Sequence, residues 1–118
     1  MSTNGRSRLF AIALVVVLLS IQTSAGPIMG AGGQGCGDWV AVRFERTLRD
    51  TALRSVMLSW VQGYLTAALI DKPTSSFRVS PPGAESVALW LTTYCQQHPL
   101  DDVFTASQAL VKDIIGER

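Results

Sequence analysis

The sequence predicts a small all-α domain closed by one disulfide bond. Apolar residues recur at intervals of three and four from Leu53 to Leu69 and again from Val87 to Cys95, a spacing typical of amphipathic helices. Cys36 and Cys95 are the only cysteines among the 118 residues, and both follow a segment with the pattern of a secretory signal peptide. An even cysteine count in a short exported chain indicates a disulfide. We therefore predict a bundle of three main helices plus a short N-terminal helix.

The first 25 residues have the three zones of an export signal. Arg6 and Arg8 precede an apolar run from Leu9 to Ile21 of about 13 residues, whereas a membrane span needs about 20. Thr23-Ser24-Ala25 offers small side chains to signal peptidase, so we expect cleavage after Ala25 and export to the periplasm. An uncleaved signal anchor is the alternative. A lipoprotein is disfavoured because no apolar residue fills the lipobox position before Cys36.

The expected mature chain has almost no net charge. The signal segment removes two of the ten basic residues, so eight remain against nine acidic ones. This balance gives no reason to expect nucleic acid, or an anionic membrane after cleavage, as a partner. Residues 26–35 are rich in glycine, and we expect a flexible tether that does not pack against a core. Residues 36–118 suffice for one small domain, which a disulfide would help to stabilise.

The first half of this domain is expected to hold a short and a long helix. The apolar residues of Asp38–Leu48 fit either a strand or a helix, and we favour a short helix. The stripe from Leu53 to Leu69 predicts a helix of about 20 residues that stops at Asp71-Lys72-Pro73. Gly63 lies inside this helix at a cost of about 1 kcal/mol. Its missing side chain would allow a second helix to approach closely.

Two more helices are expected after a loop over residues 73–83. Ser80 as N-cap and Pro81 at the first helical position predict a helix that runs to about Gln97. Pro99 suits the first turn of the last helix, where Asp101 and Asp102 would lie near the positive end of the macrodipole. The inward face of that helix is expected to comprise Val103, Ser107, Leu110 and Ile114. Gly116 is its expected C-terminal stop.

Residues suited to catalysis or metal binding are sparse. His98 is the only histidine, and together with Cys36 and Cys95 it would give three zinc ligands. A structural zinc site usually has four ligands, so a disulfide is favoured. We interpret His98 as a helix-boundary residue, with a pH-sensing role as the alternative. Asp101 and Asp102 are adjacent, and neighbouring helical residues diverge by about 100°, so they would not face one substrate. We therefore expect no catalytic residue, no metal, no cofactor and no enzyme activity.

The three tryptophans are expected to differ in their roles. Trp60 and Trp90 lie on the apolar stripes and are predicted to be core residues. Trp39 lies nearer the glycine segment and is the expected contact residue for a partner, because aromatic side chains are enriched at binding hot spots.

Two segments carry a resemblance to a known family. Tyr94-Cys95-Gln96-Gln97-His98-Pro99, followed by residues 100–105, and Cys36-Gly37-Asp38-Trp39 resemble parts of the HdeA/HdeB family of small periplasmic acid-stress chaperones. In that family a helix ends in a similar tyrosine-cysteine to proline run, and the two cysteines form the single disulfide. The Trp60–Leu65 segment is more loosely similar to uncharacterised proteobacterial proteins and to type VI secretion immunity proteins of the Rap/Tai kind.

The resemblance implies a helical protein, with Cys36 and Cys95 as its structural bridge, that binds unfolded clients under acid stress. Two features depart from the family. Its members are rich in charged residues and lose a dimer as carboxylates are protonated, whereas only 16% of this chain is charged. The cysteines are also further apart here. The alternative function is a binding or immunity module for one exported protein partner, and either function leaves room for a homodimer.

Overall fold

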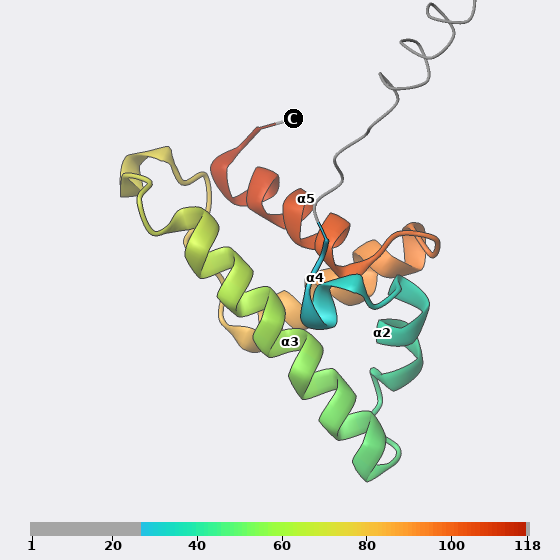
Figure 1. The fold of residues 1–118 in the computed structure, drawn as a ribbon. Helices are drawn as coiled ribbons and strands as arrows, with labels where there is room; N and C mark the ends of the chain where they lie inside the picture. Colours follow the sequence, from blue (N-terminus) through green and yellow to red (C-terminus); the bar gives the residue numbers. More distant parts are fainter. Residues whose placement is uncertain (1–26, 118) are drawn as a thin grey trace, which may run out of the picture.

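The computed structural model describes residues 27–117 and shows an all-helical fold (Figure 1). The predicted signal peptide and its cleavage site lie outside the described residues. Within residues 27–117 the chain forms four α-helices and two short 3-10 helices, which confirms the predicted class of three main helices plus a short one. In chain order they are η1 (Gly30–Gly33), α2 (Cys36–Val42), α3 (Leu48–Leu69), η2 (Thr74–Ser76), α4 (Ala84–Gln97) and α5 (Val103–Ile115).

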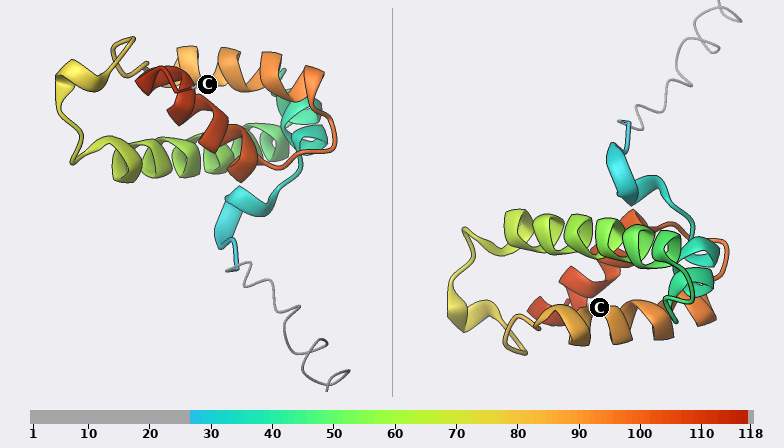
Figure 2. Two further views of the ribbon diagram at one scale, coloured as in Figure 1. Left: turned by 90° about the horizontal axis from the view of Figure 1, so that it is seen from above. Right: turned by 90° about the horizontal axis from the view of Figure 1, so that it is seen from below.

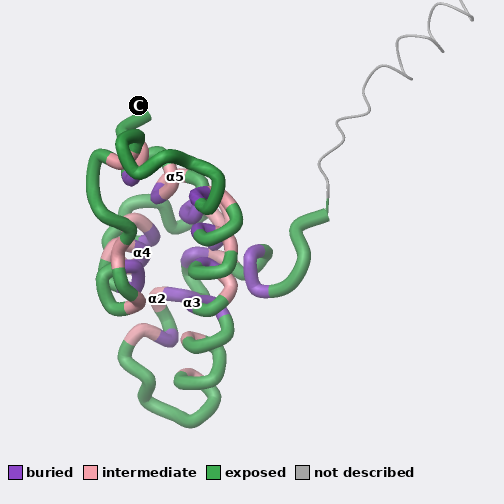
Figure 3. Tube along the Cα trace, turned by 90° about the vertical axis from the view of Figure 1, so that its left-hand side faces the viewer, coloured by how far each residue is buried: buried purple, intermediate pink, exposed green. Residues whose placement is uncertain are grey.

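The helices enclose one core. Figure 2 shows α3 and α4 side by side, with α5 lying across them and α2 closing one end. Buried residues gather on the faces that these helices turn toward one another (Figure 3). The largest fully buried side chains are Trp39, Met57, Leu91, Ile114, Val61, Val87 and Val103. No helix of the described part is long and apolar enough to cross a membrane.

The predicted disulfide is present between Cys36 and Cys95. The two sulfurs are 2.08 Å apart and the Cα atoms 4.8 Å apart, and both residues are buried. The bridge joins the first residue of α2 to the last turn of α4. Two backbone hydrogen bonds hold the same corner, from Cys36 N to the Asp101 carbonyl at 2.8 Å and from Val103 N to the Gln34 carbonyl at 2.9 Å. The start of the domain is therefore fixed to the α4–α5 loop.

The boundaries of the first two helices differ from the prediction. The short helix spans Cys36–Val42 rather than Asp38–Leu48, and Glu45 then turns the chain with a positive φ of 48°. Helix α3 begins five residues before the apolar stripe, because the Thr47 hydroxyl accepts a hydrogen bond from the amide of Asp50 and caps the helix. A Cβ added at Gly63 would meet no atom within 4 Å, so the expected close helix approach is absent there.

The start of α4 also differs from the prediction. The helix begins at Ala84 with Gly83 as N-cap, three residues after Pro81. A residue that precedes proline is pushed toward extended backbone, and both Ser80 and Pro81 precede one. In the last helix, Asp102 is the N-cap and accepts from the Thr105 amide at 2.7 Å. The inward face and the stop at Gly116, which has a φ of 71°, are confirmed.

The glycine segment packs against the domain, contrary to the expectation for residues 26–35. Ala31 and Gly32 in η1 are buried, and Gly32 lies so close to Trp60 that any side chain would overlap the indole ring. The Trp60 indole nitrogen also donates to the Met29 carbonyl oxygen at 2.9 Å. Glycine here allows close contact between backbone and an aromatic ring, which composition alone does not reveal.

The role expected for Trp39 is wrong, whereas Trp60 and Trp90 pack against the core as predicted, although only in part. Trp39 is only 1% exposed, and its indole nitrogen donates to the Thr92 hydroxyl at 3.1 Å. Trp60 and Trp90 are half-buried at the edge of the core. The disulfide from Cys36 to Cys95 holds the start of α2 against α4, and Trp39 lies one turn further along α2. Trp39 is therefore a core residue and not a contact residue for a partner.

Candidate binding groove

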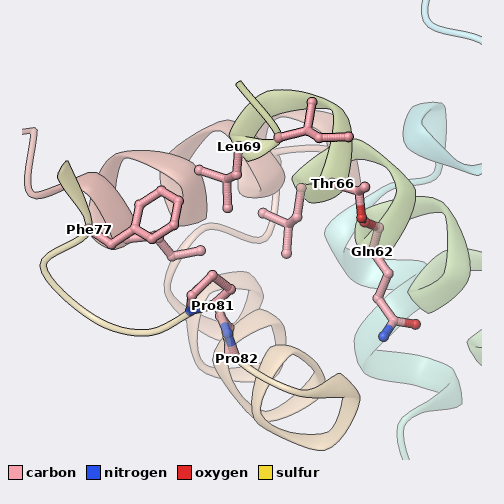
Figure 4. Close-up of a pocket in the computed structure, with 9 residues that line it drawn as sticks. Gln62, Thr66, Leu69, Phe77, Pro81 and Pro82 are labelled. Atoms are coloured by element: carbon pink, nitrogen blue, oxygen red, sulfur yellow. The ribbon is translucent and has the colours of Figure 1, made fainter. Parts of the chain in front are cut away.

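An apolar groove lies between the C-terminal half of α3, the α3–α4 loop and the end of α5 (Figure 4). We call it the α3–α5 groove. Its volume is about 320 Å³, at the lower end of the range for ligand sites, about 300–1,000 Å³. None of its lining residues is charged. They are Gln62, Leu65, Thr66, Leu69, Ile70, Phe77, Pro81, Pro82 and Ile114.

The loop wall of the groove is held in place by the backbone. The amides of Arg78 and Val79 both donate to the Ile114 carbonyl oxygen, at 2.7 and 3.4 Å. Pro81 and Pro82 restrict the chain before α4. Phe77 therefore lines the groove from a loop whose next residues are fixed.

Among the polar side chains that line the groove, the Gln62 amide is available to hydrogen-bond a ligand. The Thr66 hydroxyl donates to the Gln62 carbonyl oxygen at 2.8 Å and is satisfied within α3. The Gln62 side chain lies at the opposite end of the groove from Phe77 (Figure 4). Ile70, at the rim, is 71% exposed. This arrangement can bury an apolar group and offer one hydrogen-bonding amide beside it.

A second hollow, of about 500 Å³, lies on the outer face of α4. Its aromatic groups already contact one another: Trp90 stacks on Tyr94 with ring centroids 5.1 Å apart, and Tyr94 stacks on His98 at 4.4 Å. The Trp90 indole nitrogen donates to Asp113 at 3.1 Å. Because Trp90 and Tyr94 already stack on neighbouring rings and the indole donor is engaged, this hollow offers less to a ligand than the α3–α5 groove.

Two of the titratable residues considered from sequence, His98 and Asp101, share Tyr94 as a partner, which stacks on His98. The Tyr94 hydroxyl donates to Asp101 at 2.7 Å, whereas Asp102 caps α5. Burial, together with the hydrogen bond to Asp101, raises the pKa of Tyr94 from 10.0 to about 12, so this phenol is no base at neutral pH. His98 is exposed at the C-terminal end of α4. Among residues 27–117, no three His, Cys, Asp or Glu side chains are grouped to hold a metal ion.

Sequence reasoning missed the α3–α5 groove because three distant segments build it. One signal was available: α3 carries no charged residue from Ser55 to Ile70, although much of that stretch faces solvent. A solvent-facing helix usually has a charged side. The uncharged run therefore indicated a surface suited to an apolar partner.

Comparison with known protein families, with curated proteins and with solved structures finds no match. The functional argument therefore depends on the groove and on the chemistry of its residues.

Proposed function

We propose that this is an exported, non-enzymatic binding protein that holds apolar segments of other polypeptides in the α3–α5 groove. The uncharged lining of the groove is the observation that supports this most directly. Transfer of apolar surface from water stabilises a complex by about 25 cal/mol per Å², and a groove of this size accommodates one or two large side chains. The Gln62 amide would bond the backbone of the bound segment.

A periplasmic stress chaperone is the form of this function that we favour. Its support is the resemblance of the Cys95 region to the HdeA/HdeB family, together with the export signal and the disulfide that suit an oxidising compartment. Several large apolar side chains outside the groove are also exposed and would add weak contacts to unfolded clients; they include Val56, Val79 and Leu89.

A dedicated binding or immunity module for one exported protein is the second candidate. The loop wall of the α3–α5 groove favours it, because a wall held by backbone hydrogen bonds to Ile114 loses less conformational freedom on binding. This module would bind one partner tightly at neutral pH. A chaperone would bind many clients weakly, and more strongly below about pH 4, where carboxylates become protonated.

The test compares client protection by two matched variants. Ile70→Lys places a charge at the groove rim at both acidic and neutral pH, and Leu100→Lys places the same charge at a residue that is 98% exposed and outside the groove. Aggregation of an unfolded client, followed by light scattering, should be suppressed at acidic pH by wild type and Leu100→Lys but not by Ile70→Lys, with weaker suppression at neutral pH. Equal client protection by both variants would exclude the groove as the client-binding site. A single stoichiometric partner captured at neutral pH, without client protection, would select the second candidate.

A further inference from the structure

The turn between α2 and α3 forms one end of the molecule (Figure 1). It exposes two large apolar side chains, Phe44 at 62% and Leu48 at 90%. The positive φ of Glu45 reverses the chain between them, and the Thr47 cap fixes the start of α3. Both side chains therefore project from an ordered turn.

Three arginines lie in the same segment as these apolar side chains. The guanidinium of Arg43 lies 4.2 Å from the centre of the Phe44 ring, and that of Arg46 lies 5.6 Å from it. Arg49 is exposed in the first turn of α3. The ion pairs found within residues 27–117 all belong to Arg54, which binds Glu45 at 3.0 Å and Glu85 at 3.4 Å.

The turn consequently has a local positive charge that the chain as a whole lacks. Residues 43–49 hold three arginines against one carboxylate, that of Glu45. Arg54 pairs with both Glu45 and Glu85, and the half-buried Asp50 follows the segment directly. Net charge gave no reason to expect an anionic partner, but three arginines outside the two ion pairs of Arg54 lie within residues 43–49, at one end of the molecule. Of these, Arg43 also donates to the Val40 carbonyl oxygen. The local positive charge therefore comes from the positions of the arginines and not from the overall composition.

We infer that this turn, residues 43–49, binds the surface of an anionic lipid bilayer. Guanidinium groups pair well with phosphate, and aromatic and leucine side chains enter the boundary between headgroups and acyl chains. The turn is convex, so its side chains would enter a partner and not enclose a ligand. A lipid surface accepts such side chains without a preformed pocket. Attraction to anionic lipid adds about fivefold in affinity for each arginine near the surface.

Binding through the turn would leave the α3–α5 groove accessible. The 22 residues of α3 span about 33 Å, with the turn at the N-terminal end and the groove at the C-terminal end. This inference does not depend on the proposed function, because the two sites share no residue.

Vesicle flotation tests the inference. The processed protein, its N-terminus checked by mass spectrometry, is mixed with vesicles of phosphatidylcholine alone or with added phosphatidylglycerol. Two double variants alter the turn, Phe44→Ser with Leu48→Ser and Arg46→Ser with Arg49→Ser. The matched control is Leu100→Ser with Lys112→Ser, which removes an exposed apolar side chain and a cation elsewhere.

We expect binding to the anionic vesicles only, weakened tenfold or more by either turn variant and unchanged in the control. Raising the salt from about 0.1 M to about 1 M shortens the Debye length from about 10 to about 3 Å and should release the wild-type protein. This salt response needs no variant, so it holds even if one misfolds. Equal binding to both vesicle types, no binding at all, or binding insensitive to salt would overturn the inference. Capture of an acidic protein by the turn, in place of the lipid surface, would also overturn it.

Discussion

The indole nitrogen of Trp60 donates to the backbone carbonyl oxygen of Met29 at 2.9 Å, across 31 residues of sequence. This bond and the burial of Gly32 beneath the same ring attach the glycine segment to α3. The segment is therefore part of the folded domain, and glycine is required where the backbone meets the indole.

Gly32→Ala tests this packing, with Gly33→Ala as its matched control. A Cβ at Gly32 would overlap the six-membered ring of Trp60, whereas a Cβ at Gly33 would meet nothing within 4 Å. We expect Gly32→Ala to lower the free energy of unfolding by about 1–3 kcal/mol. Gly33→Ala should leave it unchanged or raise it by about 0.5 kcal/mol. Urea unfolding followed by tryptophan fluorescence measures both, and equal effects would show that the segment does not pack on Trp60.

Loss of the disulfide should cost much of the stability of the domain. Cys36 and Cys95 are separated by 59 residues, and closing such a loop lowers the chain entropy of the unfolded state by the equivalent of about 4 kcal/mol. We expect the Cys36→Ser, Cys95→Ser double variant to lose stability of this order in urea unfolding. The wild type should resist alkylation until it is unfolded and reduced. An unchanged unfolding midpoint for the double variant would contradict the structural role of the bridge.

Two glycines in helices should respond in opposite directions to alanine. Gly63 lies in the exposed interior of α3 with open space around it, so Gly63→Ala should stabilise the domain by about 1 kcal/mol. Gly116 ends α5 with a φ of 71°, so Gly116→Ala should destabilise it by about 1 kcal/mol. Thermal melts measure both. A loss of stability in Gly63→Ala would mean that this position has a packing partner after all.

The burial of Tyr94, together with its hydrogen bond to Asp101, predicts a loss of stability at high pH. The pKa of Tyr94 rises from 10.0 to about 12 on folding, so between these values the folded state retains a proton that the unfolded state releases. The stabilisation is complete below about pH 10 and is lost as the pH rises toward 12. In Tyr94→Phe this decline should be absent. Urea unfolding of both proteins across this range measures the difference, and parallel pH profiles would refute the raised pKa.

The helices and the disulfide were predictable because their signals are local or compositional. The inward face of α5, with Val103, Leu110 and Ile114, follows from helical spacing alone, and Gly116 marks its end. The boundaries that failed involve competing local preferences. At Ser80-Pro81 the N-cap signal did not set the start of α4, because consecutive prolines impose extended backbone there.

The groove and the positions of the tryptophans could not be predicted from local pattern. Leu69, Phe77 and Ile114 meet only because α5 crosses the C-terminal end of α3 and the loop bonds back to it. Trp39 is buried because Cys36 is tied to α4, a consequence of a bond between distant residues. These features depend on tertiary contacts, which helical periodicity does not encode.

Photocrosslinking from the groove tests the central claim most directly. A photoreactive phenylalanine analogue in place of Thr66, an exposed residue of the groove, is compared with the same analogue in place of Gln108, an exposed residue of α5 that does not line it. With an unfolded apolar client present, illumination should give a client adduct from position 66 and little or none from position 108. Equal yields from the two positions, or an adduct from position 108 alone, would contradict binding in the α3–α5 groove.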